Sequence, residues 1–213
     1  MPMKRNNSKS QEIRTVSTQP AEFRMSDDKQ EIKVSGYAAV FDEIAEIGSY
    51  FREVVRPGAF TDVLSRKDDA QFLINHDGLP LARVSSGTLK LTQDSRGLKM
   101  ETTLNANDPD VARIVPKMER GDLSKMSFSF SIYPDGEVRW TDKGDEETEL
   151  REIISVGRLF DVAIVGEPAY AGTEIALRSL EAFRAEHPVS DDEAEARALK
   201  RKFDLGLMAR RVR

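Results

Sequence analysis

The stretch MSFSFSI, residues 126–132, alternates strictly between apolar side chains and serines. Successive side chains of a β-strand point to opposite faces, so the two kinds would separate. The apolar face would carry Met126, Phe128, Phe130 and Ile132, and the other face Ser127, Ser129 and Ser131. The stretch therefore predicts a strand that packs against a hydrophobic core and holds an uncharged serine face rigidly.

Most of the chain outside this stretch also has the pattern of short strands. EIKVSGYAAVF at residues 31–41 alternates in part, and GTLKLTQD and GLKMETTL at residues 87–104 form an alternating pair joined by a turn signal. RPGAFTDVL at residues 56–64 has the spacing of a short helix. Short strands with two or three helices predict an α+β chain, mainly β, with a closed or nearly closed antiparallel sheet.

The segment NDPDVARIVPKMERGDL, residues 107–123, has the features of a longer helix. Asp108 or Asn107 can cap its start, and Pro109 suits the first turn. Pro116 lies inside the helical pattern, where a proline removes one backbone hydrogen bond and crowds the preceding turn. We therefore expect Pro116 to kink the helix or to split it into two short pieces.

Length and composition favour one domain with appendages. The chain has 213 residues, of which 39% are hydrophobic and 32% are charged. We expect a disordered N-terminus at residues 1–10, one domain at residues 11–180, and a charged helical tail at residues 181–213. The basic N-terminus has no apolar segment behind it and no run approaches a membrane span, so we expect a cytoplasmic setting.

Several kinds of chemistry are excluded or disfavoured by the residue counts. The chain has no cysteine and only two histidines, which excludes disulfides and cysteine-bound zinc and disfavours any metal site. No phosphate-binding or dinucleotide motif occurs, so no cofactor is expected. The net charge of −5 gives no general attraction to nucleic acid.

A hydrolytic site can be assembled from the residues that remain. A serine of the rigid face becomes a nucleophile only with a base in reach, and His76 in FLINHD is the candidate base. Asp161, an acid inside the apolar stretch RLFDVAIV, is the candidate group to orient the imidazole. Asp77 and Glu167 are the alternatives for that role. Each residue also has a purely structural interpretation, as a solvent-facing side chain of a strand or loop.

Six stretches in register resemble the caudoviral prohead serine proteases of tailed bacteriophages. They are VSGYAAVFDE, EVVRPGAFTDVL, FLINHD, SGTLKLTQDSRGLKMETTL, RGDLSKMSFSFSI and LFDVAIVGEPAYAGTEIALR, which together span roughly residues 31–178. The resemblance implies that His76 is the base, that Ser127 rather than Ser129 or Ser131 is the nucleophile, and that Asp161 is the third member. Ser129 departs from the family pattern, which commonly has glycine there.

The same resemblance implies a fold, an activity and partners. The family is similar to the herpesvirus assembly proteases, which implies a mostly antiparallel β-barrel surrounded by helices, with residues 11–180 as the protease domain. The expected activity is cleavage of scaffold and major capsid protein segments, and of the chain itself, inside the immature phage head in the host cytoplasm. A second copy is a possible partner, whereas nucleic acid and membrane are not expected. The alternatives are a non-enzymatic assembly module that retains the fold, or an esterase.

Overall fold

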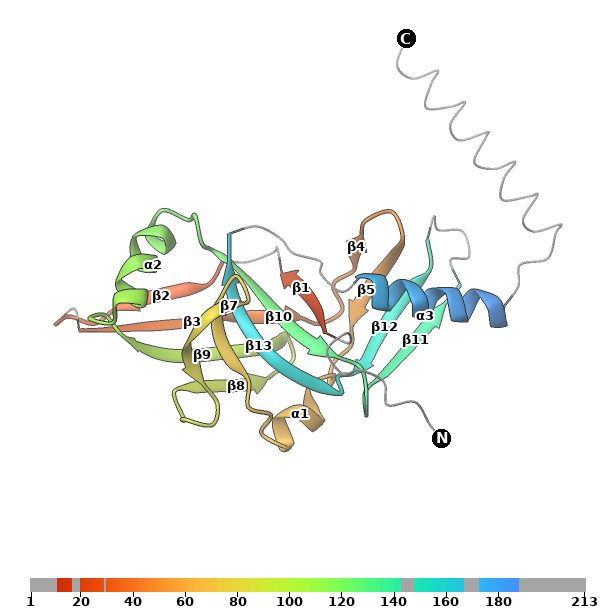
Figure 1. Cartoon of the computed structure of the whole chain (residues 1–213), viewed down its shortest axis with the longest axis horizontal. Coiled ribbons are helices and arrows are strands. Elements are labelled where there is room, and N and C mark those ends of the chain that lie inside the picture. Colours follow the sequence, from red (N-terminus) through yellow and green to blue (C-terminus); the bar gives the residue numbers. More distant parts are fainter. Residues whose placement is uncertain (1–10, 17–19, 29, 143–147, 167–172, 188–213) are drawn as a thin grey trace, which may run out of the picture. The chain divides into compact units, whose positions relative to one another are not determined.

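The computed structural model describes residues 11–16, 20–28, 30–142, 148–166 and 173–187. The chain forms two compact units, residues 1–175 and residues 176–213. The described part of the first unit is mostly β-structure (Figure 1). Its strands are β1 (Glu12–Val16), β2 (Glu22–Met25), β3 (Glu31–Val40), β4 (Ala45–Ile47), β5 (Phe51–Val55), β6 (Gln71–Ile74), β7 (Asp77–Arg83), β8 (Leu89–Gln93), β9 (Gly97–Asn105), β10 (Lys125–Ser131), β11 (Glu137–Thr141), β12 (Leu150–Ser155) and β13 (Arg158–Val165).

The strands form three separate sheets within the described residues. The orders are β1-β10-β13-β6-β7, β11-β12-β5-β4 and β2-β3-β9-β8. None of them closes on itself in that part of the chain, so the predicted closed or nearly closed antiparallel barrel is wrong. The pairs β13–β6 and β12–β5 are also parallel rather than antiparallel. Alternation predicts which face of a strand is buried, but strand pairing depends on contacts between distant segments.

Strand β10 is the second strand of the sheet β1-β10-β13-β6-β7, and its apolar side chains alternate with serines. Its apolar face enters the main hydrophobic cluster, where Phe128 and Phe130 stack with ring centroids 5.0 Å apart. Phe60 meets Phe128 edge to face at 5.6 Å. Full burial of one such side chain contributes about 1.5–3 kcal/mol. The core thus fixes one face of β10 and leaves the serine face in a defined position.

The helices agree with the sequence pattern in part. They are α1 (Thr61–Ser65), α2 (Pro109–Glu119) and α3 (Thr173–Glu186). Asp108 caps α2, because its carboxylate accepts a hydrogen bond from the backbone N–H of Asp110. Of the two effects expected of Pro116, the split is wrong, since α2 is continuous across this residue, whereas the kink stays a prediction. Helix α1 begins only at Thr61, so it covers the second half of the stretch 56–64 whose spacing predicted a short helix.

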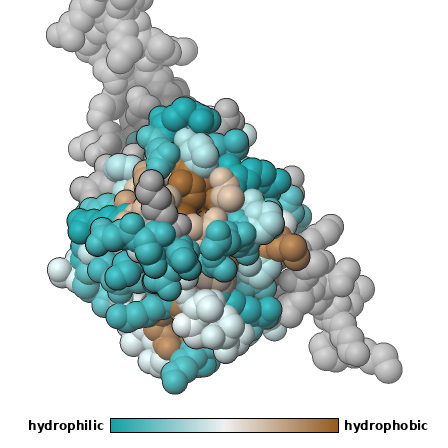
Figure 2. Space-filling view, turned by 90° about the vertical axis from the view of Figure 1, so that its left-hand side faces the viewer, coloured by the Kyte–Doolittle hydropathy of each residue, from teal (hydrophilic) through white to brown (hydrophobic). Residues whose placement is uncertain are grey.

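The face at the α2 end of the first unit is mostly hydrophilic, with small hydrophobic areas between the hydrophilic residues (Figure 2). Among the described helices none has the length and apolarity that crossing a membrane would take. Residues 1–10 and most of the predicted tail lie outside the described residues, so those domain bounds stay predictions.

Candidate active site

Ser127 lies in the middle of β10 and has an exposed fraction of 0%. It stands between two antiparallel neighbours, opposite Thr15 of β1 on one side and Ala163 of β13 on the other. The apolar side chains before and after it are held in the core, so the backbone at Ser127 has little freedom. A nucleophile on such a rigid element keeps its geometry better than one on a loop.

His76 reaches this serine from the tight turn between β6 and β7. Asn75 and His76 have φ angles of 52° and 60°, which place both in the left-handed region. That conformation is uncommon for residues other than glycine and is tolerated best by Asn and Asp. The backbone N–H of Asn75 donates to Ile164, and its side-chain oxygen accepts a bond from Gly166, which ties the turn to β13. These two bonds to β13 thus hold the turn in its strained conformation, from which the His76 imidazole reaches Ser127.

Asp161 comes from β13, where it lies opposite Ser129 of β10. The register of this ladder shifts directly after Ser129, so an irregularity of pairing stands beside the carboxylate. The side chains of Asp161 and His76 have exposed fractions of only 7% and 6%. An unpaired carboxylate at such a buried position would be costly, which is consistent with its close contact to a ring nitrogen.

The structure brings the three predicted residues into one row of contacts. Nδ1 of His76 lies 2.5 Å from Oδ1 of Asp161, and Nε2 of the same ring lies 2.7 Å from Oγ of Ser127. Both distances are those of hydrogen bonds. With one ring nitrogen on the carboxylate, the other is directed at the serine, which is the relationship that a nucleophile, a base and an orienting acid require.

The other candidates in the described part of the chain do not join this row. Asp77 is exposed and begins β7, whereas Glu167 lies outside the described residues. Ser129 accepts a hydrogen bond from the Gln11 amide at 2.5 Å, and the Ser131 hydroxyl donates to the Tyr133 carbonyl at 2.7 Å. The extra hydroxyl at Ser129 is therefore used in a contact with the N-terminal segment.

Strand β1 supplies two further contacts to Ser127 that sequence reasoning missed. The serine hydroxyl donates to the backbone carbonyl of Arg14 at 2.8 Å, and the Thr15 hydroxyl lies 3.3 Å from Ser127 Oγ. Both come from a segment more than a hundred residues earlier in the chain. Its short sequence, EIRTV, carries charges at alternate positions and so resembles a solvent-exposed edge strand.

Those charges are instead buried in a cluster of four side chains. Arg14 bonds both Glu12 and Glu53, and Arg151 also bonds both of these carboxylates. Burial by itself would raise the pKa of Glu53, but Arg14 and Arg151 bring that pKa below its ordinary value. Burial would likewise lower the pKa of Arg151, yet Glu12 and Glu53 raise it above the ordinary value. The cluster thus favours the charged forms of Glu53 and Arg151.

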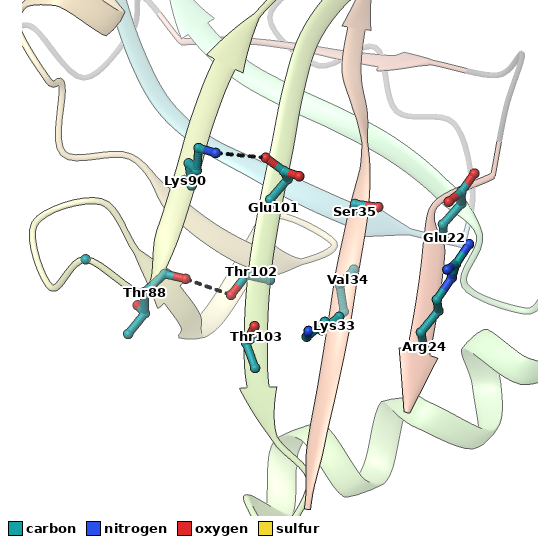
Figure 3. Close-up of a pocket in the computed structure, with 11 residues that line it drawn as sticks. Glu22, Arg24, Lys33, Val34, Ser35, Thr88, Lys90, Glu101, Thr102 and Thr103 are labelled. Carbon is teal, nitrogen blue, oxygen red and sulfur yellow. Dashed lines mark hydrogen bonds and ion pairs between the residues drawn. The ribbon is translucent and has the colours of Figure 1, made fainter. Parts of the chain in front are cut away.

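A groove of about 660 Å³ lies elsewhere, on the sheet β2-β3-β9-β8 (Figure 3). Its lining is polar, and its charges are partly paired, as between Lys90 and Glu101 at 3.3 Å. None of the three residues of the row lines it. We place the candidate chemistry at Ser127 because a nucleophile, base and acid in contact are a more specific feature than the size of a groove.

A serine, a histidine and an aspartate in one row of hydrogen bonds are the arrangement of a serine hydrolase. The chain belongs to the caudovirus prohead serine protease family, whose model matches residues 19–186, and it is therefore a phage prohead peptidase. It is similar to the prohead protease of Enterobacteria phage HK97, with 23% identity over 209 residues that cover 93% of this chain and 83% of that protein. No solved structure gives a significant match to the chain.

Proposed function

We propose that the chain is a serine endopeptidase that cleaves scaffold and major capsid protein segments, and itself, inside the immature phage head in the bacterial cytoplasm. The observation that carries the proposal is the row Asp161–His76–Ser127, with contacts of 2.5 and 2.7 Å. Family membership supports the prohead setting and capsid proteins as substrates. A second copy of the chain is a further expected partner.

In the proposed mechanism, Nε2 of His76 takes the proton of Ser127 as Oγ bonds to the carbonyl carbon of the substrate. Asp161 holds the ring in the tautomer that leaves Nε2 free to accept, and it stabilises the imidazolium that forms. The imidazolium then protonates the leaving amine as the peptide C–N bond breaks. His76 then takes a proton from water as the water oxygen bonds to the acyl carbon, and it gives this proton to Ser127 Oγ as the bond between Oγ and the acyl carbon breaks.

Coexpression with the cognate major capsid protein tests this function. The wild-type chain should shorten the capsid protein on a gel, whereas Ser127→Ala and His76→Ala should leave it at full length. Ser131→Ala is a matched control, because this serine lies on the same strand face but bonds the Tyr133 carbonyl. Cleavage that persists in both active-site variants would overturn the serine mechanism. Absence of cleavage by the wild-type chain would favour a non-enzymatic assembly module.

Self-cleavage has a separate test. Intact-mass spectrometry of the wild-type chain and of Ser127→Ala, each recovered after head maturation, should show shortened termini only in the wild type. Both termini intact in the wild type would contradict self-cleavage and leave cleavage of the capsid protein unaffected.

A further inference from the structure

Strand β1 pairs with one edge of β10, the strand that carries Ser127. Thr15 is opposite Ser127 and Arg14 is opposite Phe128, in antiparallel register, while the other edge of β10 pairs with β13. Within the described residues, β1 is therefore the strand on this edge, and it is itself the outer strand of the sheet. Extended peptides commonly bind proteins by adding one strand to such an edge.

The contact between β1 and Ser127 opposes activation of the serine. A hydroxyl has a single hydrogen, and two acceptors lie within hydrogen-bond distance of Ser127 Oγ: the Arg14 carbonyl at 2.8 Å and Nε2 of His76 at 2.7 Å. The Arg14 carbonyl therefore competes with the base for this hydrogen. The base becomes effective only when the Arg14 carbonyl no longer competes for the proton.

The Arg14 carbonyl also stands where the carbonyl of a bound peptide is needed. Its oxygen is 2.8 Å from Ser127 Oγ, so a backbone carbonyl of β1 occupies the space directly beside the nucleophile. A substrate strand paired with β10 in the register of β1 would bring one of its own carbonyls to this position. The strand and a substrate therefore exclude each other.

Strand β1 can leave the buried charge cluster without leaving an unpaired charge behind. Glu12 and Arg14 pair with each other at 2.8 Å within β1, and Glu53 and Arg151 pair at 2.8 Å within the rest of the sheet structure. Departure of the strand breaks the contacts between the two pairs but leaves each pair neutral. An uncompensated buried charge, the costly outcome of breaking an ion pair, does not arise. The family match moreover begins at residue 19, after β1.

We propose that β1 is an inhibitory strand that occupies, on β10, the place of an extended peptide substrate, so that cleavage requires β1 to leave. This inference rests on the proposed function, since it concerns access to the same serine. It assigns the substrate-binding surface to the β10 edge at Ser127 and the substrate to peptides that can adopt an extended conformation.

A reversible cross-link tests the proposal. The chain has no cysteine, so Ile13→Cys/Ser129→Cys introduces a single possible disulfide between residues that are opposite each other on β1 and β10. The probe is a dye-linked fluorophosphonate, which reacts with an activated serine, and Ser127→Ala gives the background. The oxidised double variant should label at least about tenfold more slowly than the same protein after reduction, because only the open state reacts. Equal rates would overturn the inhibition but not the proposed function.

A release variant provides the opposite change. Glu12→Gln/Arg14→Gln removes the charges of β1 and leaves the Glu53–Arg151 pair in place, so labelling of Ser127 should become several-fold faster than in the wild type. Glu22→Gln/Arg24→Gln is the matched control, with the same residue types and spacing on the exposed edge strand β2. Equal acceleration in both, or none in the release variant, would contradict the proposal. Absence of Ser127-dependent labelling in every form would overturn the proposed function itself.

Discussion

The imidazole of His76 lies against the carboxylate of Asp161, with 2.5 Å between Nδ1 and Oδ1 across 85 positions of the chain. The contact joins the turn after β6 to the middle of β13, two neighbouring strands of one sheet. Because the carboxylate occupies Nδ1, the opposite ring nitrogen is directed at Ser127. The orientation of the base is thus a property of the sheet rather than of the loop that carries it.

Asp161→Asn should therefore reduce kcat for capsid-protein cleavage by about 10³–10⁴-fold, because an amide can hold the ring in the wrong tautomer. The exposed neighbour Asp77 provides the control, and Asp77→Asn should keep wild-type activity. Cleavage rates of both variants show which carboxylate the activity depends on. Circular dichroism verifies that both variants are folded. Loss of activity in Asp77→Asn but not in Asp161→Asn would show that Asp77, and not Asp161, orients the imidazole.

The effect of a substitution at Asn75 should depend on whether the new residue tolerates a left-handed backbone rather than on the size of its side chain. Its φ of 52° is left-handed, where a β-branched residue is strained by about 1–2 kcal/mol, so Asn75→Val should unfold at lower urea concentration than Asn75→Gly. Asn75→Val should also cleave more slowly, since the imidazole of the next residue moves with the turn. If the valine variant were as stable and active as the glycine variant, the strain argument would fail.

Phe130 should carry a large share of the stability of β10. Its ring is fully buried and stacks on Phe128, so Phe130→Ala should lower the free energy of unfolding by about 3–5 kcal/mol. Tyr133, just beyond the strand and 64% exposed, is the control, and Tyr133→Ala should change it by less than about 0.5 kcal/mol. Chemical denaturation of both variants measures the difference.

Glu53 should make stability depend on acidity. Its pKa in the folded chain is below the ordinary 4.5, so its stabilising contribution is complete above about pH 4.5 and is lost as the pH falls through the folded value. The wild-type Tm should therefore fall in this acidic range, and the Tm of Glu53→Gln should fall less steeply over the same interval. Glu119→Gln, on the exposed side of α2, should follow the wild type. Identical slopes in all three would contradict the argument.

Local pattern was sufficient for several elements of this protein. The alternation in MSFSFSI predicted a strand whose apolar face packs on the core, and Phe128 and Phe130 lie there, although the serine face is buried as well. Asp108 was predicted as one of two possible caps of α2, and it is the cap. Side-chain periodicity and capping involve residues within a few positions of one another, so they can be read from sequence.

The sequence by itself, with the resemblance of its motifs to a known family, determined the secondary-structure pattern of β10 and the choice of Ser127, His76 and Asp161. Only the tertiary structure decided that the described strands form three open sheets rather than a barrel, and that β1 lies against the nucleophile. The ion pairs of Arg14 with Glu53 and of Arg151 with Glu12 were also decided only by the tertiary structure. Such contacts join segments 39 to 139 positions apart, and their free energy depends on burial and register that no local pattern contains.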